Sequence, residues 1–212
     1  MRQLVIVGAG GVARELLQTL AAMQALGFPA VCAALIVEAG YAGASEIEGV
    51  PVWEGLEQLA RHPDAAVVIA IGAPHVRRRI ANAIADAPVA EPLVHPSAML
   101  GRTVVLGEGT IVGPGAIATA DVAVGRHVQL HAGTTIGHDT RIDDFAMLAP
   151  ASTVSGNVNI GEGAFVGTGA VILPNVTVGP WSVVGAGAVV TRDVGGGVTV
   201  VGNPARPVQP SA

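Results

Sequence analysis

The spacing of apolar and polar positions changes near residue 93. Before this point, short apolar runs alternate with segments of helical spacing, in the order 4–7, 12–26, 31–37, 65–71 and 75–85. Strands that alternate with helices indicate a parallel sheet that is covered on both faces. The sequence therefore predicts an N-terminal α/β domain over residues 1–93, which we interpret as a Rossmann-like half domain.

From Val94 onward every sixth residue is apolar, through sixteen intervals without a slip. The positions are Val94, Leu100, Leu106, Val112, Ala118, Val124, Leu130, Ile136, Ile142, Leu148, Val154, Ile160, Val166, Ile172, Val178, Val184 and Val190. A period of six is a multiple of the two-residue strand repeat and does not match a helix. Sustained hexads are typical of a β-helix, whose coils bury a continuous apolar column. Residues 94–212 are predicted to form such a β-helix with a C-terminal cap.

Composition narrows the possible functions. Aromatic residues make up only 3% of the chain and 29 residues are Gly, so aliphatic side chains must build the core. The net charge is −5 and no basic stripe is visible, so no nucleic-acid partner is expected. The one basic cluster, 77–79, is expected on a solvated helix face. The single Cys32 excludes an internal disulfide and a multi-cysteine metal site. Because neither a signal peptide nor a membrane-spanning run is visible, we expect a cytoplasmic protein without a membrane partner.

Gly8, Gly10 and Ala13 form a Gly-x-Gly-x-x-Ala turn between the first predicted strand and the first predicted helix. In this context, backbone N–H groups and the helix N-terminus can meet a phosphate. A nicotinamide-dependent oxidoreductase would need two nucleotide-binding halves, and the residues before the repeat supply only one. The turn itself leaves open nucleotide binding and a tight connection that binds nothing.

His138 is the candidate general base, because imidazole titrates near neutral pH. Asp139 beside it can orient the ring only at a corner, since adjacent residues on a flat strand face opposite ways. The alternative is an exposed polar residue at a coil corner. His127, His131 and His138 do not have the spacing of a familiar zinc site, so no metal is predicted.

Three groups of segments together resemble the NeuD/PglD family of sugar acyltransferases. They are Val7-Gly8-Ala9-Gly10-Gly11; Ile69-Ala70-Ile71-Gly72 with Leu93-Val94-His95-Pro96-Ser97-Ala98; and Ile136-Gly137-His138-Asp139 with Gly202-Asn203-Pro204-Ala205. The resemblance implies a left-handed parallel β-helix with three hexads per coil. It also implies acetyl-CoA as co-substrate, a nucleotide sugar as acceptor, and a homotrimer with its sites between neighbouring prisms.

The resemblance assigns roles residue by residue. His138 and Asp139 match the base and its acidic partner, and Gly156, three hexads later, supplies a backbone N–H for the oxyanion. For His131 the alternatives are a contact to the acceptor sugar, a second proton acceptor, and a solvent-facing corner residue. The positions that match the nucleotide-sugar site are Gly10, Gly11, Val12, Val37, Glu38 and Gly72. The positions that match the acetyl-CoA site are Met147, Thr168 and Ala186.

Four of these positions depart from the family, and one is His131, where relatives often have Asn. Val12 and Met147 stand where relatives often have His, and Val37 stands where they have an acid. The sequence thus predicts an acetyl-CoA-dependent N-acetyltransferase that acts on the amino group of a nucleotide-linked amino sugar, with His138 as general base. Two alternatives remain, an O-acetyltransferase acting on a sugar hydroxyl, as in sialic acid, and a catalytically inactive nucleotide-sugar-binding scaffold.

Overall fold

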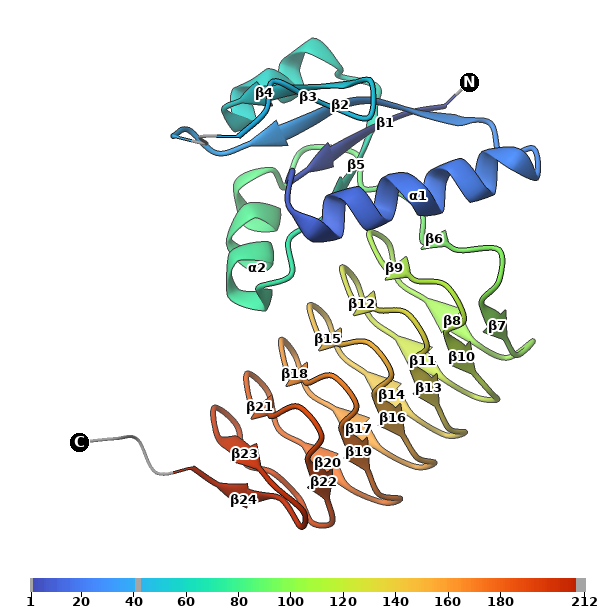
Figure 1. Ribbon diagram of the computed structural model, residues 1–212, viewed down its shortest axis with the longest axis vertical. Helices are drawn as coiled ribbons and strands as arrows, with labels where there is room; N and C mark the ends of the chain where they lie inside the picture. Colours follow the sequence, from blue (N-terminus) through green and yellow to red (C-terminus); the bar gives the residue numbers. More distant parts are fainter. Residues whose placement is uncertain (1, 41–42, 209–212) are drawn as a thin grey trace.

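The computed structural model describes residues 2–40 and 43–208, which form a sheet-and-helix unit above a triangular prism (Figure 1). In the N-terminal unit, five strands pair in the order β3-β4-β2-β1-β5, and every pair is parallel except β3–β4. Its elements are β1 Arg2–Val7, α1 Gly11–Ala25, β2 Ala30–Val37, β3 Glu46–Ile47, β4 Val50–Glu54, the 3-10 helix η1 Leu56–Arg61, β5 Ala66–Ile69 and α2 Pro74–Ala83. The predicted alternation of strands and helices is therefore present.

The apolar runs form the central strands because both faces of the sheet are covered. Val5 and Ile6 are fully buried although their side chains leave β1 on opposite faces. The helix α1 covers one face with an apolar stripe that includes Leu16 and Leu20, and its bounds agree with the predicted helix to within one residue. This packing brings the carboxyl ends of β1, β2 and β5 to one edge of the sheet.

Between residues 93 and 190, the prism is built from two-residue strands that pair in parallel with the strand 18 residues later, as Ile117 pairs with Thr135 and Thr135 with Thr153. Sheet I contains β7 Met99–Leu100, β10 Ile117–Ala118, β13 Thr135–Ile136, β16 Thr153–Val154, β19 Val171–Ile172 and β22 Val189–Val190. Sheet II contains β8 Val105–Leu106, β11 Ala123–Val124, β14 Arg141–Ile142, β17 Asn159–Ile160 and β20 Thr177–Val178. Sheet III contains β6 Leu93–Val94, β9 Ile111–Val112, β12 Gln129–Leu130, β15 Met147–Leu148, β18 Phe165–Val166, β21 Val183–Val184, β23 Thr199–Val201 and β24 Arg206–Pro207.

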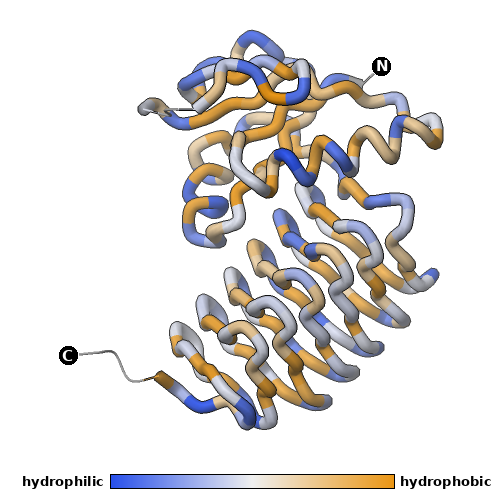
Figure 2. Tube along the Cα trace, in the orientation of Figure 1, coloured by the Kyte–Doolittle hydropathy of each residue, from blue (hydrophilic) through white to orange (hydrophobic). Residues whose placement is uncertain are grey.

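The hexad residues form the interior of the prism. Ile136, Val154 and Ile172 stack in successive coils with at most 1% exposure. Figure 2 shows the same recurrence as apolar stretches that repeat along the coils. The predicted fold class, a Rossmann-like half domain followed by a left-handed parallel β-helix, is confirmed.

The junction between the two units lies within a single strand. β6 pairs with β9 and so forms the first strand of sheet III. Leu93 packs into the core of the N-terminal unit, whereas Val94 packs against the core of the prism. The two side chains leave the strand on opposite faces, so each reaches a different core. The domain boundary after residue 93 stays a prediction.

Three edges join the three sheets, and each edge recurs in every coil. We name them by the sheets that they connect: the I–II edge includes residues 137–140, the II–III edge 143–146, and the III–I edge 167–170. The N-terminal unit lies over the end of sheet III and beside the II–III edge (Figure 1). None of the helices that the described residues form has the length and hydropathy needed to cross a membrane.

Candidate active site

The glycine turn after β1 opens onto a pocket at the carboxyl edge of the N-terminal sheet. Gly8 has a φ of +125°, and a Cβ there would lie 2.7 Å from the carbonyl oxygen of Ala70, so only glycine fits. By contrast, nothing lies within 4 Å of the Cβ positions of Gly10 and Gly11. No side chain caps the start of α1, which leaves its first N–H groups available to an anion.

The pocket has a volume of about 300 Å³. Its lining includes every position that the family resemblance assigns to the nucleotide sugar, namely Gly10, Gly11, Val12, Val37, Glu38 and Gly72. A crevice beyond the carboxyl ends of parallel strands, at a helix N-terminus, is where α/β folds bind phosphorylated ligands. We call it the nucleotide pocket.

Glu38 carries a partner that the sequence did not indicate. Arg79 of α2 donates from two guanidinium nitrogens to the two carboxylate oxygens of Glu38, each at 2.7 Å. These hydrogen bonds lower the pKa of Glu38, so the carboxylate is ionised at neutral pH. The arginine run gave no signal for this pair, because only the fold shows that α2 faces the end of β2.

A second pocket, of about 250 Å³, lies between α1 and sheet III, and Val12 lines both pockets. It contains His131, whose Nδ1 lies 3.5 Å from a carboxylate oxygen of Glu15. Burial lowers the pKa of His131, so the imidazole is uncharged at neutral pH. Within the described residues, neither His131 Nε2 nor Gln129 Oε1 has a hydrogen-bond partner, although both are buried. We call this cavity the His131 pocket.

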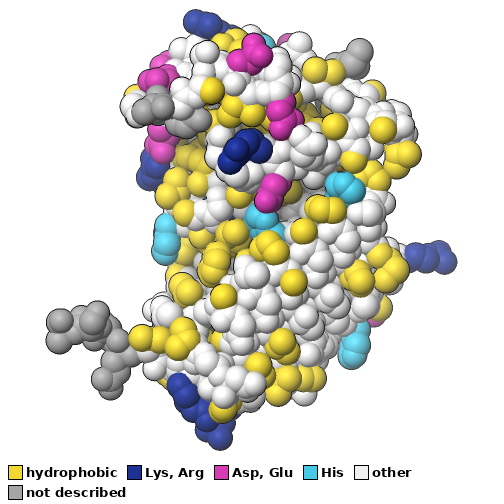
Figure 3. Space-filling model, viewed as in Figure 1, with side chains coloured by type: hydrophobic (Ala, Val, Ile, Leu, Met, Phe, Trp, Pro, Cys, Tyr) yellow, Lys and Arg dark blue, Asp and Glu magenta, His cyan; other side chains and the backbone are white. Residues whose placement is uncertain are grey.

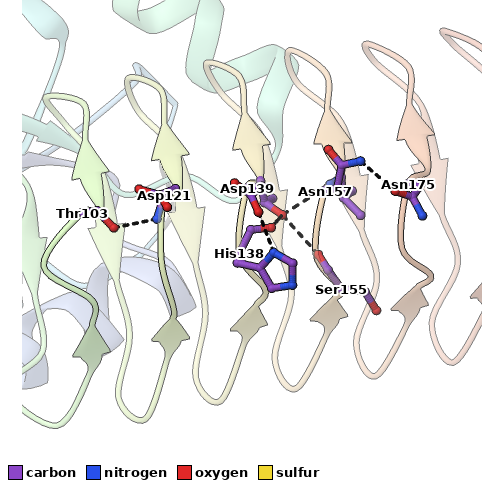
Figure 4. A network of polar contacts seen from close by, with 9 residues as sticks. Thr103, Asp121, His138, Asp139, Ser155, Asn157 and Asn175 are labelled. Atoms are coloured by element: carbon purple, nitrogen blue, oxygen red, sulfur yellow. Dashed lines mark hydrogen bonds and ion pairs between the residues drawn. The ribbon is translucent and has the colours of Figure 1, made fainter.

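His138 and Asp139 lie together at the I–II edge, and Figure 4 shows their side chains in contact. Their Nδ1 and Oδ2 atoms are 2.7 Å apart. Asp139 has a φ of +55°, a left-handed conformation that Asp and Asn tolerate better than most other residues. Asp121, Asn157 and Asn175 occupy the same position in other coils with similar φ angles. This corner turns the two adjacent side chains toward each other, as the sequence-based pairing requires.

Gly156 lies directly below the imidazole of His138. A Cβ at residue 156 would lie 2.7 Å from both Cε1 and Nε2 of the ring. The ring can occupy this position only because residue 156 has no side chain. The φ of Gly156 is not in the left-handed region, so its backbone does not by itself require glycine. Within the described residues, no acceptor pairs with the Gly156 N–H. The edge therefore combines an exposed imidazole, a carboxylate partner and a free backbone donor.

The three predicted acetyl-CoA positions lie at two places. Thr168 and Ala186 stack along the III–I edge, where the Thr168 carbonyl accepts a hydrogen bond from the Gly187 N–H (2.8 Å). Met147 instead lies on sheet III, with its methyl carbon 3.6 Å from the Cβ position of Gly72 beside the nucleotide pocket. Its predicted contact with acetyl-CoA stays a prediction.

One chain does not bring all the predicted site residues together. His138, Asp139 and Gly156 occupy the I–II edge, whereas the His131 pocket adjoins sheet III and the start of the III–I edge. Sheet I separates these two edges of the prism. His138 and the nucleotide pocket of one chain therefore lie on different sides of the prism.

Comparison with known proteins gives two family matches. Residues 3–84 match the PglD N-terminal domain, and residues 157–192 match the bacterial transferase hexapeptide of six repeats. The curated proteins contain no significant match.

Several solved structures resemble the whole chain. PerB from Caulobacter crescentus, in complex with CoA and GDP-perosamine, is 32% identical with a TM-score of 0.88, over 99% of this chain and 98% of that one. The acetyltransferase domain of PglB from Neisseria gonorrhoeae, in complex with acetyl coenzyme A, is 30% identical with a TM-score of 0.87, over 98% and 99%. WeeI from Acinetobacter baumannii is 28% identical with a TM-score of 0.85, over 98% and 100%.

Proposed function

The chain belongs to the NeuD/PglD family of hexapeptide-repeat sugar acyltransferases, and we propose that it acetylates the amino group of a nucleotide-linked amino sugar. It is an acyltransferase with acetyl-CoA as co-substrate, in common with neighbours solved with CoA or acetyl-CoA. The observation that supports the chemistry most directly is the His138 imidazole, which contacts Asp139 and lies over the free N–H of Gly156.

The arrangement at the I–II edge supports direct transfer between the two substrates. The sugar amine attacks the thioester carbonyl carbon while His138 accepts its proton, and the Gly156 N–H donates to the oxyanion. The C–S bond then breaks, and the leaving thiolate takes the proton from the imidazolium. Asp139 holds the ring orientation and stabilises the positive charge that the ring acquires.

The two pockets support an acceptor made of a nucleotide and a sugar. A diphosphate fits the uncapped start of α1, and the Glu38–Arg79 pair borders the same pocket where a ribose or base can bond. The sugar then extends past Val12 toward His131, whose uncharged ring can accept a hydrogen bond. Because PerB was solved with GDP-perosamine, GDP-linked amino sugars are the first acceptors to test.

We propose that the protein is a homotrimer in which a neighbouring prism completes each site. The outward residues of sheet I are uncharged. Met99 is exposed, and the others are part-exposed, namely Ile117, Thr135, Thr153, Val171 and Val189. In the view of Figure 3 the acidic side chains gather over the N-terminal unit, and the prism surface is mostly uncharged. An uncharged face between two edges with complementary functions is suited to contact between copies.

The test follows CoA thiol release with acetyl-CoA and a set of nucleotide-linked amino and hydroxy sugars. We expect turnover with an amino acceptor, and His138→Ala is expected to reduce kcat by roughly 10²- to 10⁴-fold. Turnover only with hydroxy sugars would instead support O-acetylation. Binding of nucleotide sugar without any CoA binding would support the inactive scaffold. Near-wild-type turnover in His138→Ala would reject the assigned base.

The shared site has its own test. The molecular mass of the protein in solution should correspond to three chains. Co-expression of His138→Ala with Gly11→Glu, which fills the nucleotide pocket, should restore activity in mixed trimers. Each variant then contributes the intact half that the other lacks. If each chain contains a complete site, every subunit of the mixture carries one defect and no activity returns.

A further inference from the structure

One arginine is entirely buried between the two units of the chain. Arg77 of α2 has no solvent exposure, contrary to the expectation that residues 77–79 form a solvated helix face. Its NH1 donates to the carbonyl oxygens of Ile71 (2.7 Å) and Gly72 (3.0 Å). Ile71 and Gly72 line the nucleotide pocket. One end of the guanidinium therefore holds the wall of that pocket.

The rest of the guanidinium holds the II–III edge of the prism. Nε donates to the carbonyl of His127 (2.8 Å), and NH2 donates to those of Phe145 (2.5 Å) and Ala146 (3.2 Å). These carbonyls belong to successive coils, because His127 and Phe145 are 18 residues apart. A planar guanidinium with five donors can span such a set, and an ammonium cannot.

The burial of Arg77 is unusual because no carboxylate is among its hydrogen-bond partners in the described residues. Burial lowers the pKa of Arg77 to about 9, which still leaves the group charged at neutral pH. Removing a charge from water costs several kcal/mol unless its hydrogen bonds are satisfied. An apolar contact would join the two units without the free-energy cost of removing a charge from water. Holding the units together therefore does not by itself explain why an arginine is buried here.

Two further contacts hold the same segment against the prism. Gln129 of sheet III donates from Nε2 to the carbonyls of Ile69 (3.2 Å) and Ile71 (3.3 Å). At the start of α2, His75 stacks on Trp181 with ring centroids 4.5 Å apart. The guanidinium of Arg78 lies 4.2 Å from the centroid of the same indole ring. The pocket wall 69–72 and the start of α2 are thus both fixed to the prism.

We infer that Arg77 is a positioning residue, which sets the place of the nucleotide pocket relative to the prism and so the point where a nucleotide-anchored amine meets the acyl donor. The inference rests on the proposed function. The nucleotide is held by the N-terminal unit, whereas the donor and the base belong to prisms. A shift of the pocket by about 1 Å would displace the amine while leaving each binding site intact, and such a shift can cost about 10²-fold in rate.

The test compares Arg77→Lys with wild type and with Arg61→Lys, an exposed arginine of η1 that contacts Trp53 instead. In Arg77→Lys we expect kcat with the nucleotide-linked acceptor to fall by about 10²-fold. Affinities for GDP and for CoA, measured separately by calorimetry, should change by less than about threefold, because their contacts remain. Arg61→Lys should match wild type in all three measurements.

A purely structural role would predict a different pattern. If Arg77→Lys weakens GDP binding as much as it lowers kcat, or retains full kcat, the inference is wrong. If Arg77→Lys does not fold, Trp181→Ala loosens α2 without touching the guanidinium, and it should lower kcat with GDP affinity unchanged.

A wild-type protein without turnover would contradict the proposed function. In that case, backbone amide hydrogen exchange of the ligand-free proteins tests the inference about Arg77. The inference requires faster exchange in Arg77→Lys than in wild type at both residues 70–73 and residues 145–147, with exchange in β1 unchanged.

Discussion

Replacing Gly156 by Ala tests whether the space below His138 is needed for catalysis. The added Cβ would lie 2.7 Å from Cε1 and Nε2 and 3.1 Å from Cδ2 of the ring. Ordinary contacts between such atoms begin near 3.5 Å, so the ring must move by about 1 Å. Because the His138 side chain is 67% exposed, the ring can move into solvent without disturbing the core.

A movement of this size at a reacting group is expected to lower kcat by about 10²-fold in the thiol-release assay. The fold should persist, because the φ of residue 156 suits any residue and losing a glycine stabilises a chain by about 0.4–1 kcal/mol. Gly195→Ala is the matched control, since its nearest atom is Val198 Cγ2 at an ordinary 3.5 Å. A Gly156→Ala variant with kcat within twofold of wild type would refute the proposed geometry.

Three other changes probe separate parts of the molecule. Asp139→Asn keeps a residue that tolerates the left-handed φ but removes the charge, so kcat should fall at least about tenfold with both substrate affinities retained, as steady-state kinetics would show. Glu38→Gln breaks the charged pair with Arg79 and should weaken nucleotide-sugar binding by about tenfold while calorimetry shows unchanged CoA binding. Burial lowers the pKa of His127 to about 4, so only the unfolded chain gains this proton as pH falls from about 6.5 toward 4, and stability declines over that window. His127→Phe copies the Phe145 of the next coil and has no imidazole to protonate. Between pH 7 and pH 5, its free energy of unfolding in urea should therefore fall by about 2 kcal/mol less than that of wild type.

The sequence predicted the prism well because its hexad period is a local property that each coil repeats. Ile136 and Val154 could be placed in one column from spacing alone once the coil length was known. The His138–Asp139 contact was also predictable, since it depends on one corner between neighbouring residues. The stacking of Gly156 under the ring follows from the same register.

Contacts between the two units were not predictable in this way. Arg77 lies in a run of three arginines, and nothing local distinguishes the buried member from Arg78 or Arg79. Its partners on the prism, such as Phe145, are distant in the chain, and all its partners are main-chain carbonyls, which leave no mark on the sequence. Met147 likewise matched a family position, but its contact with Gly72 depends on how α2 and sheet III meet.

The end strands of sheet III are covered by other parts of the chain, and this affects whether prisms can stack end to end. The first, β6, is shielded by α1, and the last parallel strand, β23, is covered by the antiparallel β24. Open ends of a solenoid are templates on which further chains can stack into fibres. With this ladder closed at both termini, growth along the long axis is blocked there and only sideways association remains. Removal of residues 202–208 would uncover β23 and favour filamentous aggregates.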